Sequence, residues 1–143
     1  MRKTPLKRKS LVKNNEWYRK KCVHLAKRIV RHEANYKCDY CGFGEPDRTT
    51  HGSHIYSEGL NHGMSADLDN ILCICATHHM AASPWNRASK WSWHNSPAEA
   101  MDWFREKYPE KAEELRLRAQ NPIKRDFKKL HEELKERWKN LIN

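Results

Sequence analysis

Two pairs of potential metal ligands carry the clearest chemistry in the sequence. Cys38 and Cys41 form a Cys-x-x-Cys pair followed by Gly42, and Cys75 and His78 have the same two-residue gap. Thiolates and imidazoles at this spacing bind one zinc ion from a tight turn, and glycine supplies the positive φ that such a turn often needs. The spacing therefore predicts a structural Zn²⁺ site with four ligands, Cys38, Cys41, Cys75 and His78.

The other cysteines allow one alternative for this ligand set. Cys73 lies two residues before Cys75 on an expected strand, so both would face the same side, and Cys73 could replace one ligand. Cys22 falls in a helical pattern and is expected in the core. Five cysteines without an apolar leader favour a reducing compartment, in which metal coordination explains cysteines better than disulfides do.

Composition restricts the classes of protein that the chain can belong to. Its 143 residues fit one domain and leave no room for a two-domain enzyme, and only 38% of them are hydrophobic, so the core must be small. No apolar run is long enough for a membrane span or a secretory signal, which favours a cytoplasmic protein without a membrane partner. The net charge of +10 indicates an anionic partner, most simply nucleic acid.

The elements that must position the ligands follow from charge and apolar spacing. Residues 1–15 are basic and are expected to form a flexible arm, either a solubilising tail or a DNA contact through Lys7, Arg8 and Lys9. Residues 16–36 show the apolar spacing of an amphipathic helix. Residues 37–96 hold all five glycines and form the ligand-bearing core.

Two further helices are expected after this core. Ser96-Pro97-Ala98-Glu99 resembles a capping box and predicts one helix over 97–120, packed on the core. Asn121-Pro122 has the same start signal and predicts an amphipathic helix over 121–143. Its apolar seam is expected to pack on its own domain rather than in a dimer coiled coil, and a protein-interaction adaptor that uses the seam is a third hypothesis. The seam consists of Ile123, Phe127, Leu130, Leu134, Trp138 and Leu141.

The order of the ligand residues resembles that of the HNH (ββα-metal) endonucleases, in their phage-encoded, zinc-stabilised form. A cysteine pair and a Cys/His pair bracket a histidine segment and an asparagine, and a second histidine follows directly. Residues 91–104 resemble the Trp-rich segment of such phage proteins, and the basic opening at 6–10 is similar to the Rap/NinG group of phage recombination nucleases. The main stretches are Cys38-Asp39-Tyr40-Cys41, Ser53-His54-Ile55-Tyr56-Ser57, Asp69-Asn70 and His78-His79.

The resemblance implies a role for each histidine and for the asparagine. His54 would be the general base, Asn70 would hold the loop bearing it, and His79 would bind a catalytic divalent metal, Mg²⁺ or Mn²⁺. The family usually places Asp or His immediately before the base, as the other metal ligand, but this chain has Ser53. His51 lies on the same strand face as Ser53 and could bind the metal instead.

The implied fold is an α+β, zinc-stabilised ββα-metal core with flanking α-helices, and the implied activity is metal-dependent DNA hydrolysis. Phage DNA recombination or processing in the host cytoplasm would be its setting, with a recombinase or another DNA-processing protein as a partner. Arg87 and Lys90, among tryptophans, would contact DNA. The alternative is a non-catalytic zinc module that binds nucleic acid, and Ser53 supports it. A monomer or a dimer fits either hypothesis.

Overall fold

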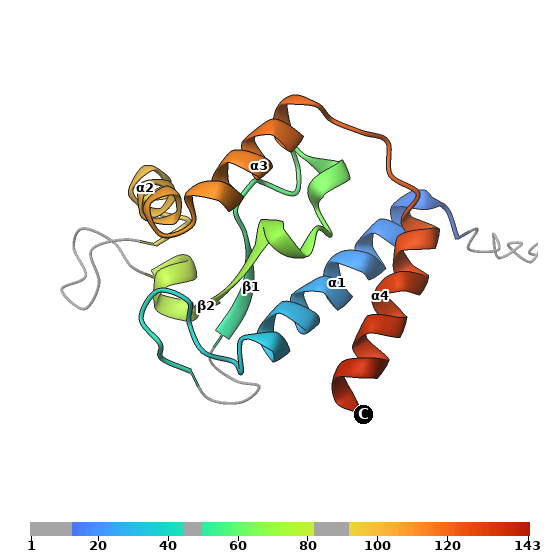
Figure 1. Ribbon diagram of the computed structural model, residues 1–143, viewed down its shortest axis with the longest axis horizontal. Helices are drawn as coiled ribbons and strands as arrows, with labels where there is room; N and C mark the ends of the chain where they lie inside the picture. The colour runs from blue at the N-terminus through green and yellow to red at the C-terminus, as the bar shows by residue number, and fades with distance from the viewer. Residues whose placement is uncertain (1–12, 45–49, 82–91) are drawn as a thin grey trace, which may run out of the picture.

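The computed structural model describes residues 13–44, 50–81 and 92–143 and has an α+β architecture (Figure 1). The α-helices in this part of the chain are α1 (Asn15–Glu33), α2 (Pro97–Lys107), α3 (Pro109–Gln120) and α4 (Phe127–Ile142). The strands are β1 (Thr50–His54) and β2 (Ile71–Cys75). Short helical turns are η1 (His62–Met64), η2 (Leu68–Asn70) and the π-type turn η3 (Thr77–Ala81). The predicted fold class is therefore confirmed at the level of α+β.

The two strands form an antiparallel pair that separates two apolar clusters. Their register pairs Gly52 with Cys73 and Ser53 with Leu72. Because side chains alternate along a strand, the pair presents one face to each cluster. The first cluster lies between the strands and helices α2 and α3, and the second lies against α1 and α4. Buried members of the first include Leu72, Ile74, Trp93, Phe104 and Leu115, and those of the second include Cys22, Leu25, Ile29, Ile71, Phe127 and Leu134.

Helix α1 agrees closely with the amphipathic pattern of its sequence. Its N-cap is Asn14, whose side chain accepts a hydrogen bond from the Trp17 amide at 2.9 Å. The buried stripe contains Cys22, Leu25 and Ile29, spaced by three and four residues as a helix face requires. In Figure 1 this helix and α4 lie side by side, and their apolar residues share the second cluster.

The single helix predicted over 97–120 is wrong, because the chain breaks at Tyr108 and Pro109. Proline has no amide hydrogen to donate, and it excludes the residue before it from helical backbone angles. Tyr108 accordingly has φ −129° and ψ 64°, and Pro109 opens α3. The Tyr108 hydroxyl donates to the Asp39 carboxylate at 2.8 Å, which fixes the corner. Ser96 makes no side-chain capping bond, so the predicted capping box is also absent.

The C-terminal helix begins later than predicted. Its N-cap is Asp126, which accepts from the Lys129 amide at 3.1 Å, whereas the Asn121 side chain donates to the Leu117 carbonyl of α3. Ile123 lies outside the helix and is exposed. The other five seam residues belong to the cluster shared with α1, so the expected packing on the same domain is confirmed. Within the described ranges, no helix combines the length and the apolar character needed to cross a bilayer.

The two clusters predict that truncating a buried side chain of α2 lowers the free energy of unfolding more than truncating an exposed one of α3. Phe104→Ala should lower the free energy of unfolding by about 3–5 kcal/mol, because the ring is fully buried and its removal leaves a cavity. Leu117→Ala should change it by less than about 0.5 kcal/mol, since Leu117 is 47% exposed. Urea denaturation followed by far-UV circular dichroism measures both, and equal losses would contradict this placement of the core.

Candidate metal centre and the neighbouring histidines

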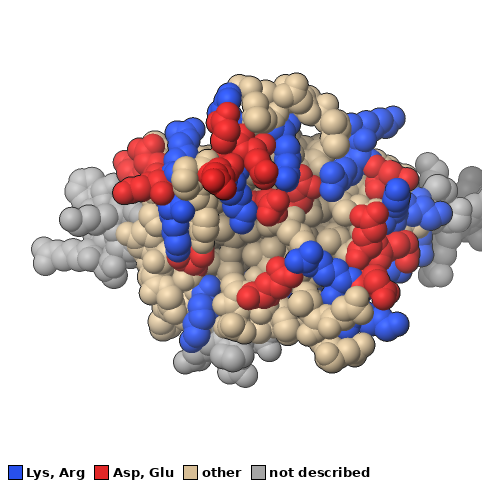
Figure 2. Space-filling model, viewed as in Figure 1, with Lys and Arg blue, Asp and Glu red and all other residues tan. Residues whose placement is uncertain are grey.

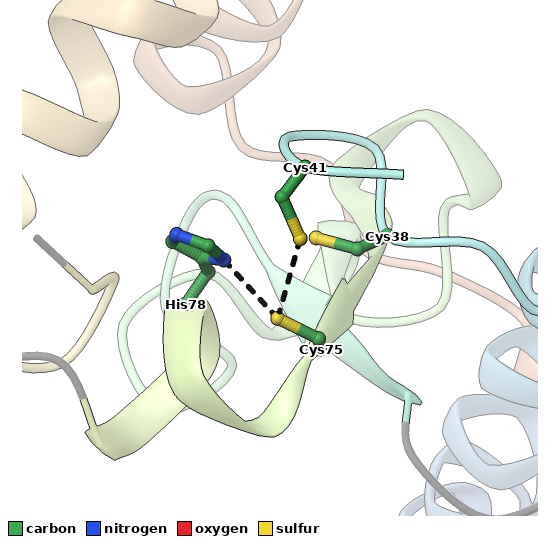
Figure 3. Close-up of side chains that lie close together, drawn as sticks. All are labelled: Cys38, Cys41, Cys75 and His78. Carbon is green, nitrogen blue, oxygen red and sulfur yellow. Dashed lines mark hydrogen bonds between the residues drawn. The ribbon is translucent and has the colours of Figure 1, made fainter. Parts of the chain in front are cut away.

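Four potential ligands from two distant segments converge on one point (Figure 3). Cys38 and Cys41 come from the turn after α1, Cys75 ends β2, and His78 lies in η3. Their ligand atoms, three sulfurs and one imidazole nitrogen, all lie within 4.8 Å of one another. These are the four residues that the spacing predicted, so a Cys₃His site able to hold a metal ion is present.

The distances within this cluster fit a tetrahedral metal ion. The Cys41 and Cys75 Sγ atoms are 3.8 Å apart, and Cys75 Sγ lies 3.1 Å from His78 Nδ1. Two thiolates on one zinc ion, each about 2.3 Å from it, would be about 3.8 Å apart at the tetrahedral angle. Zinc therefore fits the donor set in both chemistry and spacing.

Backbone hydrogen bonds explain why the first cysteine pair adopts this shape. The Gly42 amide donates to the Cys38 carbonyl at 2.8 Å, and Gly42 has φ +74°, a left-handed conformation that favours glycine. The Asp39 amide donates to the Cys73 carbonyl at 2.8 Å. This second bond attaches the cysteine turn to β2 and brings Cys38 and Cys41 to Cys75.

Burial keeps the cluster thiols protonated unless a cation is bound. Desolvation, helped by the neighbouring Cys38 and Cys41 thiols, raises the pKa of Cys75 well above its ordinary value. Several adjacent thiols cannot all ionise at neutral pH unless positive charge offsets them. A divalent ion would supply that charge, and ion binding would then stabilise the fold.

The remaining cysteines are not part of this site. Cys73 pairs with Gly52 across the strands and does not belong to the four-residue group, so it does not replace a ligand. Cys22 is buried, its thiol donates to the Phe127 carbonyl at 3.2 Å, and burial raises its pKa to about 11. The expectation that Cys22 serves the core is confirmed.

A second group of potential ligands consists of histidines from three elements. His51 of β1 and His79 of η3 place their Nδ1 atoms 2.9 Å apart. His94, in the turn before α2, stacks edge-on against His79 with ring centroids 4.8 Å apart, and its amide donates to the His79 carbonyl. Burial, then the charges of His94 and His51, lowers the pKa of His79 to about 4. The His79 ring is therefore neutral at physiological pH, as a metal ligand must be.

The side chain of His94 is exposed and packs against His79, whereas the neighbouring Trp93 is buried next to Phe104. A contact of this kind leaves no motif in the sequence.

His54 has one ring nitrogen engaged and the other available. Its Nε2 lies 2.7 Å from the Ser65 carbonyl oxygen, which can only accept, so Nε2 carries the proton. Nδ1 of the neutral ring then holds the lone pair and can accept a proton. Burial is the main cause that lowers the pKa of His54 below its ordinary value, which keeps the ring neutral near pH 7.

Asn70 joins the loop after β1 to the turn before β2. Its side-chain oxygen accepts from the Tyr56 amide at 2.8 Å, and its nitrogen donates to the Tyr56 and Met64 carbonyls at 3.1 and 3.2 Å. The side chain is fully buried and uses all these bonds to fix backbone. This arrangement agrees with the loop-holding role expected for it.

Several predicted residues fall outside the described part of the chain. The expected DNA contacts Lys7, Arg8 and Lys9 lie within residues 1–12, and Arg87 and Lys90 lie within 82–91. Their interactions with DNA stay predictions. Ser53, at the position where a metal ligand was missing, is buried in β1 opposite Leu72.

No protein-family model, curated protein or solved structure matches the chain. The geometry of the site is therefore the main evidence for function. The two features on which an assignment must depend are therefore the Cys₃His cluster and the histidines beside it. Both are built on the same pair of strands and the turn that follows them.

The Cys₃His cluster predicts one tightly held zinc ion per chain. Cys41→Ser should weaken zinc binding by at least about 100-fold and lower the midpoint of thermal unfolding, because serine is a poor zinc ligand. Cys22→Ser is the matched control, since it also removes a thiol but leaves the four ligands intact. Metal content after dialysis, measured by mass spectrometry, and thermal unfolding test this. Equal zinc retention in both variants would argue against the site.

Proposed function

We propose that this protein is a metal-dependent DNA endonuclease of the HNH (ββα-metal) type. The observation that carries the proposal is the position of His54 in β1, where the Ser65 carbonyl fixes its tautomer. The same strand carries His51, whose ring contacts His79. A potential base thus accompanies a pair of potential ligands for a catalytic metal. In this proposal the Cys₃His cluster holds a purely structural zinc ion.

The arrangement of elements supports this assignment. The proposal requires two antiparallel strands followed directly by a helix that carries a metal ligand. Here β1 pairs with β2, and η3 follows β2 after one residue and carries His79. The adjacent residue His78 belongs to the Cys₃His cluster, so zinc binding would also fix the position of His79.

The histidine pair fits a divalent ion in its donor spacing. Two nitrogen ligands, each about 2.1 Å from one ion, are separated by about 3.0 to 3.4 Å. The observed 2.9 Å between the Nδ1 atoms of His51 and His79 lies close to this range. The His94 ring packs edge-on against His79, with ring centroids 4.8 Å apart. An ion bound there, Mg²⁺ or Mn²⁺, would supply positive charge for the phosphate and the leaving oxygen.

The reaction that follows needs one proton acceptor from the protein. His54 Nδ1 takes a proton from water, and the water oxygen attacks the phosphorus atom. The bond to the leaving oxygen breaks, that oxygen takes a proton from solvent, and the imidazolium of His54 returns its proton to solvent. Ser65 holds the ring in the required tautomer, and Asn70 fixes the loop from which Ser65 acts.

DNA is the proposed substrate because of the net charge of +10. The resemblance to phage recombination nucleases suggests a role in phage DNA recombination or processing, with a recombinase as a partner. The second candidate function is a non-catalytic zinc module that binds nucleic acid. It is favoured by Ser53, which is buried and cannot supply the usual ligand before the base.

Replacing His54 separates these two functions. His54→Ala should reduce metal-dependent nicking of supercoiled plasmid by about 10²- to 10⁴-fold, because the proton acceptor is lost. His24→Ala, an exposed histidine of α1, is the control and should keep full activity. Zinc content and DNA binding should be unchanged in both. Wild-type protein that binds DNA without cleaving it in Mg²⁺ or Mn²⁺ would support the binding module instead.

The environment of His54 also predicts the acid limb of the pH–rate profile. Burial lowers the pKa of His54 from its ordinary 6.5, so the base is already neutral at that pH. The nicking rate should therefore be maintained down to pH 6.5 and fall only at lower pH, as the ring becomes protonated. Single-turnover rates at saturating metal measure this. A midpoint above pH 7 would be inconsistent with His54 as the base.

A further inference from the structure

Lys27 of α1 lies directly on strand β1 at Gly52. A Cβ atom added to Gly52 would come within 2.6 Å of Lys27 Cγ, 2.7 Å of its Cβ and 3.1 Å of its Cα. Distances this short exclude any side chain at position 52, so glycine is what lets the helix approach the strand. The aliphatic stem of Lys27 is therefore held against β1.

The strand places Lys27 on the same face as the proposed base. Alternate residues of a strand share a face, so His54 lies on the same face of β1 as Gly52. His51, which contacts His79, lies on the opposite face, because its partner Ile74 belongs to the cluster shared with α2 and α3. Burial is the main cause that lowers the pKa of His54, and the Lys27 charge also contributes to this lowering.

Four other cations of α1 are engaged by described residues, whereas Lys27 is not. Arg19 bonds to Glu16 and Glu58, both at 2.7 Å, and Arg28 stacks on Trp138. Lys27 makes no hydrogen bond, ion pair or aromatic contact within the part of the chain that the structure describes. The structure thus holds the Lys27 stem on the face of β1 that carries His54, and the ammonium group has no anionic partner among the described residues. Other engaged cations of this helix are Lys21, over Trp17, and Arg31, over Tyr36.

We propose that Lys27 binds an oxygen of the scissile phosphate, with its stem positioned by Gly52, on the face of β1 that carries His54. This inference rests on the proposed function, because it takes a DNA phosphodiester as the ligand. A fixed ammonium group at this point offsets the negative charge that builds on the phosphate oxygens during attack. Lys27 then contributes both to DNA affinity and to the rate of cleavage.

Three variants test this role. Lys27→Met removes the charge but keeps an unbranched stem on Gly52, and Lys27→Arg restores the charge. Lys20→Met is the matched control, because Lys20 is an exposed lysine of the same helix and its loss changes the net charge equally. Zinc content and urea midpoints of all three should match those of the wild type.

Two measurements are made on each full-length variant. The first is plasmid nicking. The second is binding of a fluorescein-labelled 20-base-pair duplex, without catalytic metal and at several salt concentrations. Lys27→Met should nick about 10²-fold more slowly. Its salt dependence of binding should fall by about one counterion. Lys27→Arg should recover most of the rate, and Lys20→Met should nick like the wild type. Equal behaviour of Lys27→Met and Lys20→Met in both measurements would overturn the proposal.

The binding measurement keeps this inference distinct from the proposed function. If the wild type binds the duplex but does not nick plasmid with either metal, the nuclease proposal fails. Lys27 is then judged by the duplex alone. Weaker binding by Lys27→Met than by Lys20→Met would keep Lys27 as a phosphate contact, and equal binding would reject it.

Discussion

The convergence of three thiols and one imidazole on a single point is the interaction on which the rest of the structure depends. Each strand has only five residues, and an isolated two-stranded hairpin is marginal in water. The cluster joins the turn after α1 to the end of β2 and to η3. One bound ion would therefore replace much of the apolar core that a basic chain with 38% hydrophobic residues does not have.

The two faces of the strand pair pack against different helices. One face packs with α2 and α3 around Phe104, and the other packs with α1 and α4. The proposed metal-binding histidines lie beside the Cys₃His cluster. There His78 belongs to the structural cluster, and the next residue, His79, contacts His51. Charged side chains lie around the face that Figure 2 shows, with Lys and Arg interspersed among Asp and Glu, so no single basic patch defines a DNA surface in that view.

The sequence predicted those parts of the site that have fixed spacing. The four cluster ligands were found because each pair is separated by two residues, and the amphipathic pattern of α1 was equally clear. The break before Pro109 was missed because the capping signal at Ser96 and the apolar spacing beyond it suggested one continuous helix. His94 and Lys27 carry no local pattern, since their positions depend on packing between elements far apart in the chain.

We propose that one strand pair and the turn after it support two metal sites of different chemistry. A crystal structure of the zinc-loaded protein soaked in Mn²⁺, with anomalous data collected at the absorption edges of both metals, tests this most directly. The account predicts zinc bound by Cys38, Cys41, Cys75 and His78 and manganese bound by His51 and His79. Zinc alone, with no manganese at the histidines, would contradict it.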